Sequence, residues 1–542
     1  MTQNQSINDA VSIPQAVALG CTYDDVPYPS YPVAASHPDR LYGVARLFGL
    51  SPVPPERARI LEIGCAGGGN LLPIASQFPN STCVGIELSQ VQVDDAVIAN
   101  KLIGLKNIQI KQGSVADITP EFGKFDYILC HGVFSWVPEF VREAILKVAS
   151  QNLSENGVAF ISYNTLPGWY FRGMVREMLL RHVKDIESPL KKIEQARALL
   201  GFLVDASQSQ NTPHAAYLRG EAEFLSKQPD TYLFHDHLEE YNNPFFFEDF
   251  IDGASKHGLQ YLGESNLATM WNGNLPVETR QKLDTIPDAV KRAHYADCIV
   301  GRTFRQTLLV HKGLSISRML GKDNVDGVRV LGKFTLIEPP YKASDSTVPQ
   351  EKSYKTLGDQ IMTTSQPVCH AIMESIHEAF PQSLSIDELY AAVEKKAAAD
   401  LQHDNMTQKE VLATMVQWML AGYIDFRFDK DRLTTNINGN PTVTSWARTQ
   451  ACANRYVTNL RHEMMTVSEL HRQIIPFLDG SRDISGIANE IQVLIELGML
   501  DINVKSSLTD LKSKDLPLRI AKQIVSDIGR FGLLLSTPDA FM

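Results

Sequence analysis

A glycine-rich turn directly after an apolar strand is the feature that most constrains the fold of this chain. Residues 58–63 (Ala-Arg-Ile-Leu-Glu-Ile) have the β-branched and apolar character of a buried parallel strand. The next run, Gly64-Cys65-Ala66-Gly67-Gly68-Gly69-Asn70, forces the backbone to turn, and Gly64 and Gly67 provide positions without a Cβ. A helix is predicted from Asn70 to Gln77, so that its first amides face the turn. The sequence therefore predicts an α/β domain with a nucleotide-binding turn.

The spacing within the turn distinguishes three kinds of nucleotide site. A P-loop would end in Gly-Lys-Ser/Thr, whereas this turn ends in Gly-Asn-Leu. The dinucleotide pattern Gly-x-Gly-x-x-Gly fails in register, because Ala66 stands two residues after Gly64. The pattern that remains is Glu-x-Gly-x-x-Gly, in which Glu62 precedes the first glycine by two residues.

An acidic residue lies at the end of the next predicted strand, Thr82–Leu88. This residue, Glu87, stands 23 residues after Gly64, where a mononucleotide-binding half places the acid that holds ribose hydroxyls. The turn and this acid together resemble the first motifs of the class I S-adenosylmethionine-dependent methyltransferases. The resemblance implies a Rossmann-like sheet and S-adenosyl-L-methionine as cofactor. The alternative is a Rossmann-like domain whose loop binds no nucleotide.

The resemblance also implies which residues contact the cofactor. The turn after the third predicted strand, residues 112–117, occupies the place where these enzymes hold the adenine ring, with one polar and one apolar contact. The expected cofactor-binding residues are Glu62, Gly64, Cys65, Ala66, Gly67, Asn70, Glu87, Leu88, Ser114, Val115 and His131.

Aromatic and polar residues follow the fourth and fifth predicted strands, residues 125–130 and 157–162. The carboxyl ends of parallel strands meet at one edge of a sheet, where doubly wound folds bind their ligands. We therefore expect the substrate site to be lined by His131, Trp136, Tyr163, Asn164 and Trp169. His131 or Tyr163 would accept a proton from the substrate. The alternative for Tyr163 and Trp169 is that they cap the core.

Composition excludes several other classes of protein. The 542 residues contain no run of 18 apolar residues and no signal peptide at the N-terminus, so we expect a cytoplasmic protein without membrane insertion. The 51 basic and 62 acidic residues give a net charge of −11, which opposes non-specific binding to nucleic acid. The seven cysteines stand singly, and His235-Asp236-His237 has no third ligand at fixed spacing, so no metal site is predicted.

Breaks in the pattern divide the chain into five parts. Residues 1–40, rich in proline and tyrosine, are predicted to form a strap packed on the next domain, and 41–315 to form the methyltransferase domain, with a helical insert at 165–245 over the site. Residues 316–350 are predicted to be a linker. Three helical patterns followed by a hairpin predict a winged-helix-like domain at 351–440, whose third helix carries one lysine, which favours a role in protein interaction over DNA binding. Residues 441–542 are predicted to be helical.

Several motifs together resemble one bacterial family, the methyltransferases with a regulatory domain that include the protein lysine methyltransferases of rickettsial outer membrane protein. They are residues 36–41 (Ser-His-Pro-Asp-Arg-Leu), 61–71, 131–137, 162–169, 241–247, 304–308 and 458–463. The resemblance covers nearly the whole chain and implies methyl transfer to lysine side chains of a protein. Two alternatives stay open: a methyltransferase for a small or lipid-linked metabolite, and a non-catalytic scaffold that binds S-adenosylmethionine.

Overall fold

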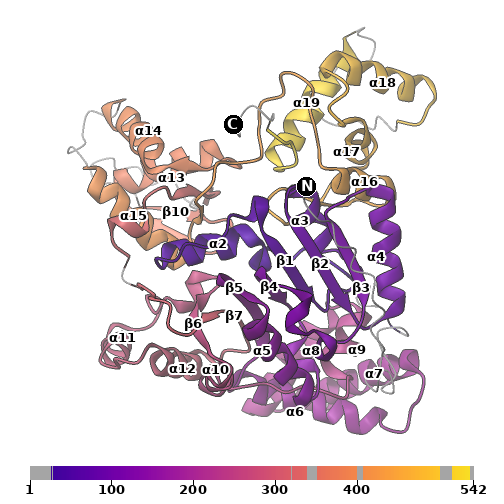
Figure 1. The fold of residues 1–542 in the computed structure, drawn as a ribbon, viewed down its shortest axis with the longest axis vertical. Helices are drawn as coiled ribbons and strands as arrows, with labels where there is room; N and C mark the ends of the chain where they lie inside the picture. Colours follow the sequence, from indigo (N-terminus) through magenta and orange to yellow (C-terminus); the bar gives the residue numbers. More distant parts are fainter. Residues whose placement is uncertain are drawn as a thin grey trace.

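The computed structural model describes Val26 and residues 29–318, 320–337, 351–399, 407–500 and 515–536. A seven-stranded sheet at its centre has the order β3-β2-β1-β4-β5-β7-β6 (Figure 1). Its strands are β1 (Arg59–Ile63), β2 (Thr82–Glu87), β3 (Ile108–Gln112), β4 (Phe125–Cys130), β5 (Leu153–Asn164), β6 (Leu259–Glu264) and β7 (Phe304–His311). The first five are parallel, and β7 runs antiparallel to both β5 and β6. The predicted Rossmann-like sheet is confirmed.

Helices cover both faces of this sheet because successive strand residues point to opposite faces. On β1, Ile60 packs with α2 (Pro38–Leu47) and α3 (Leu71–Gln77), whereas Leu61 packs in the core that contains α5 (Glu139–Gln151) and α10 (Phe247–Lys256). Between β2 and β3 lies α4 (Gln90–Ile103), capped by Ser89 and ended by Gly104 at φ 73°. The strand order reverses between β1 and β4, which opens a crevice at their carboxyl ends.

Four helices follow β5 and form an insert with a core of its own. They are α6 (Gly168–Val183), α7 (Pro189–Ser207), α8 (Pro213–Ser226) and α9 (Asp230–His237). Because α6 starts four residues after β5 ends, the insert begins at the carboxyl edge of the sheet (Figure 1). A second helical pair, α11 (Val277–Asp284) and α12 (Ala289–Val300), separates β6 from β7.

The part of the chain after the sheet differs from the prediction in two places. The stretch predicted as a linker at 316–350 contains β8 (Arg329–Leu331) and β9 (Thr335–Ile337), and Val330 and Leu331 on β8 are buried. β8 is the central strand of a three-stranded sheet between β12 (Leu384–Ser385) and β13 (Asp425–Arg427). The predicted hairpin is also wrong, because β13 pairs with β8 and not with the residues that follow it. Residues 342–350 lie outside the described part.

The three helices predicted between 351 and 440 are present as α13 (Pro367–Ala379), α14 (Ile386–Ala399) and α15 (Gln408–Ala421). The apolar face of α15, including Met415 and Trp418, is buried in the core rather than offered to a partner. A second small sheet is made by β9, β10 (Lys352–Lys355) and β11 (Ile361–Thr364).

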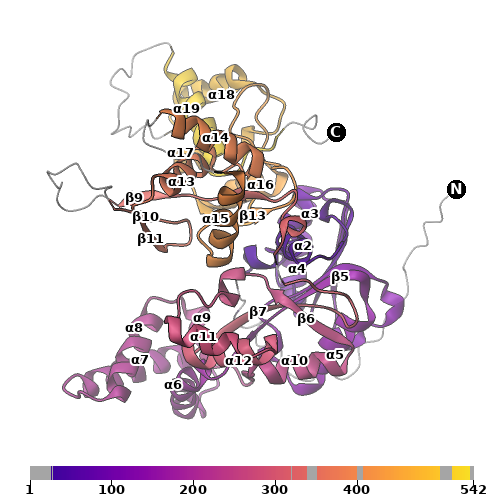
Figure 2. The same cartoon turned by 90° about the vertical axis from the view of Figure 1, so that its left-hand side faces the viewer.

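The C-terminal region is helical with one short hairpin. Its elements are α16 (Ser445–Ala453), β14 (Tyr456–Thr458), β15 (Met464–Thr466), α17 (Glu469–Ile474), α18 (Ile484–Glu496) and α19 (Leu516–Arg530). They share a separate core, and α16 packs on α3 and α4 of the methyltransferase-like sheet. In Figure 2 the orange and yellow C-terminal parts lie above the indigo and magenta sheet domain.

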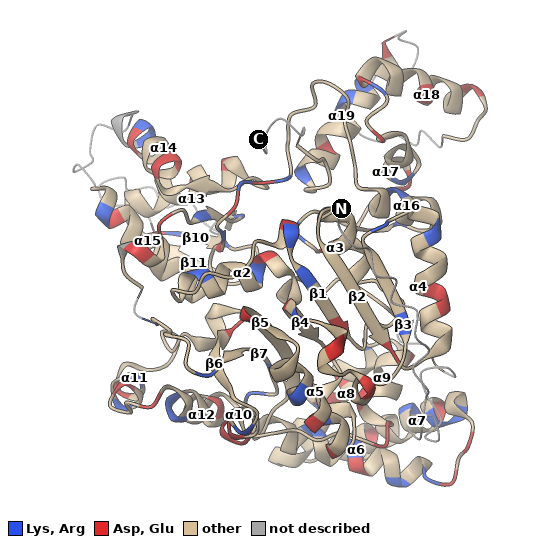
Figure 3. Ribbon diagram, viewed as in Figure 1, with Lys and Arg blue, Asp and Glu red and all other residues tan. Residues whose placement is uncertain are grey.

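Short 3-10 helices complete the fold: η2 (Ala34–Ser36), η3 (Pro55–Arg57), η4 (Val115–Asp117), η5 (Pro120–Phe122), η6 (Phe134–Trp136), η7 (Leu267–Met270), η8 (Lys322–Asn324) and η9 (Ile475–Phe477). Basic and acidic residues are interspersed over all parts of the fold (Figure 3). No helix among the described residues is long and apolar enough to cross a membrane.

Candidate active site

The glycine-rich turn has the backbone conformation that its composition requires. Gly64 has φ +71°, and its amide donates to the carbonyl of Ile86 at 2.8 Å. A Cβ on Gly64 would lie 2.5 Å from a methyl group of Val133, so only glycine fits. Ala66 also has a positive φ, of 46°. The second glycine of the turn in the left-handed region is Gly68, at φ +78°.

Glu87 stands at the end of β2 and receives two backbone amides. Its Oε2 accepts from the amide of Ala66 at 2.9 Å and its Oε1 from that of Ser89 at 3.0 Å. These bonds hold the carboxylate on the rim of the turn, where it was predicted to hold ribose hydroxyls. Leu88 follows it and is exposed.

Glu62 lies beneath the turn with half of its carboxylate unsatisfied. Oε1 accepts from Asn70 Nδ2 at 2.7 Å, whereas the buried Oε2 has no hydrogen-bond partner among the described residues. Burial raises the pKa of Glu62 to about 8, and the Asn70 hydrogen bond acts in the opposite direction. A buried acceptor without a partner is costly, so the site suits a ligand that brings a donor. The ammonium group of S-adenosylmethionine is such a donor, and the residues present therefore fit this cofactor.

Two other predicted cofactor residues use their side chains within the protein. The thiol of Cys65 packs against β2, where a Cβ on Gly85 would lie 2.6 Å from its Sγ. Ser114 caps η4, and its Oγ accepts from the amide of Ala116 at 3.2 Å. Val115 is buried next to it, at the end of β3. These positions leave the backbone of Cys65 and the rim formed by Ser114 and Val115 for contacts with a ligand.

His131 directly follows β4, and its ring is hydrogen-bonded to Ser162 on β5. Nδ1 lies 3.1 Å from Ser162 Oγ, and the same oxygen accepts from the amide of Gly132 at 2.9 Å. Ser162 thus joins the His131 ring to the backbone of the loop after β4. Burial lowers the pKa of His131 to about 4, so the ring is neutral at pH 7.

Tyr163 is a correction to the predicted site. Its side chain is 1% exposed, its ring stacks on Phe250 of α10 at 3.9 Å, and its hydroxyl lies 3.0 Å from Thr307 Oγ1. Because neighbouring strand residues point to opposite faces, Tyr163 enters the core while Ser162 reaches His131. Burial raises the pKa of the Tyr163 hydroxyl well above its usual value. The alternative interpretation, a core residue, is the one that the structure supports.

Asn164 joins the edge of the sheet to the segment after α9. Its amide donates to Ser135 Oγ at 2.9 Å and its Nδ2 to Asn242 Oδ1 at 3.0 Å. The amide of Asn243 donates to the Ser135 carbonyl at 2.7 Å. Asn164 therefore fixes the end of β5 against the loop after β4.

Three rings from the loop after β4 and from the insert lie together at this edge. Trp136 and Trp169 are edge-to-face, with centroids 6.1 Å apart, and His237 of α9 lies 6.4 Å from Trp169. Trp169 and His237 are buried, while Trp136 is partly exposed. Both ring nitrogens of His237 lack a partner among the described residues, and burial lowers its pKa to about 3.

His235 has a different environment from His237. Its Nδ1 lies 2.9 Å from Glu239 Oε1 and its Nε2 2.7 Å from the Val26 carbonyl. The two histidines therefore differ in their contacts.

Residues 29–33 of the predicted N-terminal strap cross the glycine-rich turn, a contact that the sequence did not specify, whereas residues 1–25 of the strap lie outside the described part. Ser30 Oγ accepts from the amide of Gly69 at 2.7 Å, and the amide of Val33 donates to Asn70 Oδ1 at 2.8 Å. A Cβ on Gly69 would lie 2.2 Å from the Ser30 carbonyl oxygen. Glycine at this position is the local signal for such a close approach.

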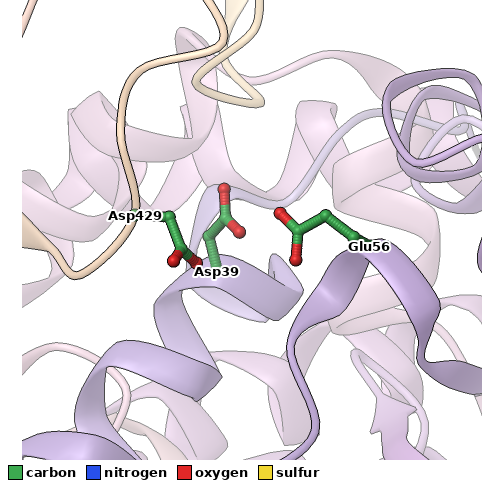
Figure 4. Close-up of side chains that lie close together, drawn as sticks. All are labelled: Asp39, Glu56 and Asp429. Atoms are coloured by element: carbon green, nitrogen blue, oxygen red, sulfur yellow. The ribbon is translucent and has the colours of Figure 1, made fainter. Parts of the chain in front are cut away.

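Three carboxylates lie together near the start of α2, within 4.8 Å of one another: Asp39, Glu56 and Asp429 (Figure 4). Arg432 pairs with Glu56. Burial raises the pKa of Asp39 and of Asp429 to about 6 in each case. The group joins the sheet domain to the loop after β13.

Comparisons with known proteins match three parts of the chain to family models. A methyltransferase domain matches residues 60–157, a predicted methyltransferase regulatory domain 229–311, and the PKMT C-terminal winged helix domain 439–525. The last match gives a fold to a region that the sequence predicted only as helical. The winged-helix-like domain predicted at 351–440 stays a prediction.

Full-length relatives extend the similarity to nearly the whole chain. Uncharacterized protein RP789 of Rickettsia prowazekii is 38% identical over 506 residues, which is 92% of this chain and 90% of RP789. RP028 of the same organism is 41% identical over 244 residues, which is 44% of this chain and 96% of RP028. The structure of PKMT2 from Rickettsia typhi, also solved in complex with AdoHcy, has 31% identity and a TM-score of 0.81 over 94% of this chain and 100% of PKMT2.

The fold, the turn and these matches define a class I methyltransferase that uses S-adenosylmethionine. Within that class the chain belongs to the family that combines this domain with the methyltransferase regulatory domain and the PKMT winged helix.

Proposed function

We propose that the enzyme transfers methyl groups to lysine side chains of a protein. The observation that carries the proposal is the edge-to-face pair Trp136 and Trp169 at the carboxyl edge of the sheet. Transfer from a sulfonium needs an aligned, neutral amine, and burial between aromatic walls favours the neutral form of lysine. The similarity to PKMT2 from Rickettsia typhi, together with the sequence resemblance to the family that includes protein lysine methyltransferases, supports the same substrate class.

The residues at the carboxyl edge of the sheet would have different roles in binding and orienting the acceptor. The two tryptophans would exclude water from the amine, and the loop after β4 would be positioned by Asn164 and Ser162. His131 is neutral, and with a pKa near 4 it is a weak base. We therefore assign it to positioning of the acceptor rather than to removal of a proton.

The direct test is transfer of a tritiated methyl group from S-adenosylmethionine into a lysate of the source organism, with Glu87→Ala as the inactive control. Label in a protein that releases methyl-lysine on hydrolysis is the expected result. Label confined to small molecules would overturn the proposal in favour of a metabolite substrate. Binding of S-adenosylhomocysteine without any transfer would favour the scaffold alternative.

A second test uses the tryptophan pair. Trp136→Ala and Trp169→Ala should each lower kcat/KM for the acceptor at least about tenfold, because aromatic walls contribute on the order of 1–3 kcal/mol to a buried group. The dissociation constant for S-adenosylhomocysteine should stay within about twofold. Trp446→Ala in α16, remote from the edge, is the matched control, and equal losses in all three variants would contradict the assignment.

A further inference from the structure

His462 of the C-terminal domain reaches the glycine-rich turn. Its Nε2 lies 2.6 Å from Asn70 Oδ1, a contact between residues 392 positions apart in the chain. The side chain is 1% exposed, and Nδ1 has no partner among the described residues. Because Oδ1 is an acceptor, Nε2 carries the proton, and burial lowers the pKa of His462 so that the ring is neutral.

Asn70 connects this histidine to the carboxylate under the turn. Its Oδ1 accepts from His462 and from the Val33 amide, at 2.6 and 2.8 Å. Its Nδ2 donates to Glu62 Oε1 at 2.7 Å and to Ser36 Oγ at 3.1 Å. Because His462 and the Val33 amide both donate to Oδ1, the side-chain amide of Asn70 faces one way, with its NH2 group directed at Glu62. The free Oε2 of Glu62 is thereby oriented as well.

The segment that carries His462 is held rigidly by its own domain. His462 has φ +61°, an uncommon conformation for a residue other than glycine or asparagine. Asn459 Oδ1 accepts from the amides of Arg461 and Glu463, at 2.9 Å each. The Leu460 amide donates to the Gly532 carbonyl at 2.9 Å, and the Leu460 carbonyl accepts from Gln77 Nε2 at 3.2 Å. A strained, buried residue supported in this way indicates a functional constraint.

We propose that His462 is a positioning residue for the cofactor site: through Asn70 it orients Glu62 toward the ammonium group of S-adenosylmethionine. The C-terminal domain is then part of the cofactor site and does not act only as a surface for partners. The proposal concerns cofactor binding and is independent of which acceptor is methylated.

The test compares two substitutions of His462 by the affinity for S-adenosylhomocysteine in isothermal titration calorimetry. Gln keeps a donor near the Nε2 position, whereas Asn is too short to reach Asn70 but tolerates the positive φ. His462→Asn should raise the Kd about fivefold to tenfold, the value of one hydrogen bond to a buried group. His462→Gln should stay within about twofold of wild type.

Val457→Ala provides the control for a merely structural effect. Val457 is fully buried in the C-terminal core and does not belong to the turn. It should lower the melting temperature without changing the Kd. The proposal is overturned if His462→Asn binds as wild type does, if His462→Gln loses as much as His462→Asn, or if Val457→Ala weakens binding equally.

Discussion

Glu87 connects the glycine-rich turn to the carboxyl edge of the sheet, where the ligand is expected to bind. Its two oxygens accept from the amide of Ala66 in the turn and from that of Ser89 at the start of α4. A carboxylate with several amide donors is pre-oriented, so a ligand with two hydroxyls needs no rearrangement of the site.

Removal of this carboxylate should therefore abolish cofactor binding. Glu87→Ala is expected to raise the Kd for S-adenosylhomocysteine by at least about 100-fold, since two charge-assisted hydrogen bonds are lost and two amides become unpaired. Calorimetry measures the change. Asp95→Ala, which removes one exposed carboxylate from α4, should bind as wild type does. Unchanged affinity in Glu87→Ala would assign the ribose contact to another residue.

Tyr163 makes the opposite case, a side chain at the right place in the sequence that points into the core. Tyr163→Phe removes its hydrogen bond to Thr307 and should cost about 1 kcal/mol of stability, measured by urea unfolding. Turnover should stay within about twofold, because the hydroxyl does not face the crevice. A loss of more than about tenfold in turnover at unchanged stability would return Tyr163 to the catalytic residues.

At the scale of elements, a buried ion cluster joins the last two strands to α12. Arg305 on β7 pairs with Glu264 of β6 and, at 2.7 Å, with Asp297 of α12. Glu264 also accepts from Thr307 Oγ1 at 3.1 Å. All three charged groups are nearly inaccessible to solvent. The cluster therefore fixes the segment 265–303 against the sheet.

Loss of Arg305 should be strongly destabilising, because Glu264 would stay buried without a counterion and Asp297 would keep only Arg302. Arg305→Met is expected to destabilise the protein by about 3 to 5 kcal/mol, measured by chemical unfolding. Arg181→Met on α6 removes an exposed arginine whose partner, Glu177, is also exposed, and it should change stability by less than about 0.5 kcal/mol. Similar effects of the two substitutions would show that the buried cluster is not tightly coupled to folding.

Local signals explain which elements the sequence could predict. The helix α4 is predictable because Ser89 precedes it as an N-cap residue, apolar residues recur along it and Gly104 follows it. The strands of the large sheet were predictable because they are apolar and bounded by turns. The three-residue strands β8, β13, β14 and β15 are too short for periodicity to detect, and pairing partners such as those of β8 are distant in the chain.

Local sequence signals also determine which residues of the candidate site could be predicted. The turn, Glu62, Glu87 and the residues that follow β4 and β5 were found because they stand at strand ends. The side on which Tyr163 points depends on one position in the strand register. The contacts of Asn70 with Val33 and His462 depend on the packing of distant segments, for which a single sequence contains no local pattern.

At the scale of the whole molecule, polar contacts attach the C-terminal parts to the sheet domain. Arg40 of α2 pairs with Asp425 of β13 at 2.6 Å, and Arg432 contacts both Glu56 and the Gln77 carbonyl. The carboxylates of Asp39, Glu56 and Asp429 face one another across this interface (Figure 4). Two opposing effects therefore set the stability of this interface: attraction between the arginines and the carboxylates, and repulsion among the three carboxylates.

The stability of this interface should depend on pH with a defined sign. For Asp429, burial and the nearby Glu56 and Asp39 raise the pKa from 3.8 to about 6, while Arg432 and Arg46 act against the shift. The folded state then holds a proton that the unfolded state has released between about pH 4 and 6, so the contribution of this group to stability falls as pH rises through that window. Above about pH 6 Asp429 is ionised in the folded state, and it then lowers the stability of the protein by its full amount.

Asp429→Asn tests this sign. The variant should be more stable than wild type at pH 7.5, by about 1 kcal/mol since solvent screens part of the repulsion, and the difference should vanish near pH 4. Thermal unfolding at both pH values in the presence of a chelator measures it, with Asp95→Asn as a control that shows no such dependence. A variant less stable than wild type at pH 7.5 would mean that attraction to Arg432 and Arg46 outweighs repulsion among the carboxylates. In that case the ionised carboxylate of Asp429 would hold the C-terminal part in place, and the interface would tighten, not loosen, as pH rises.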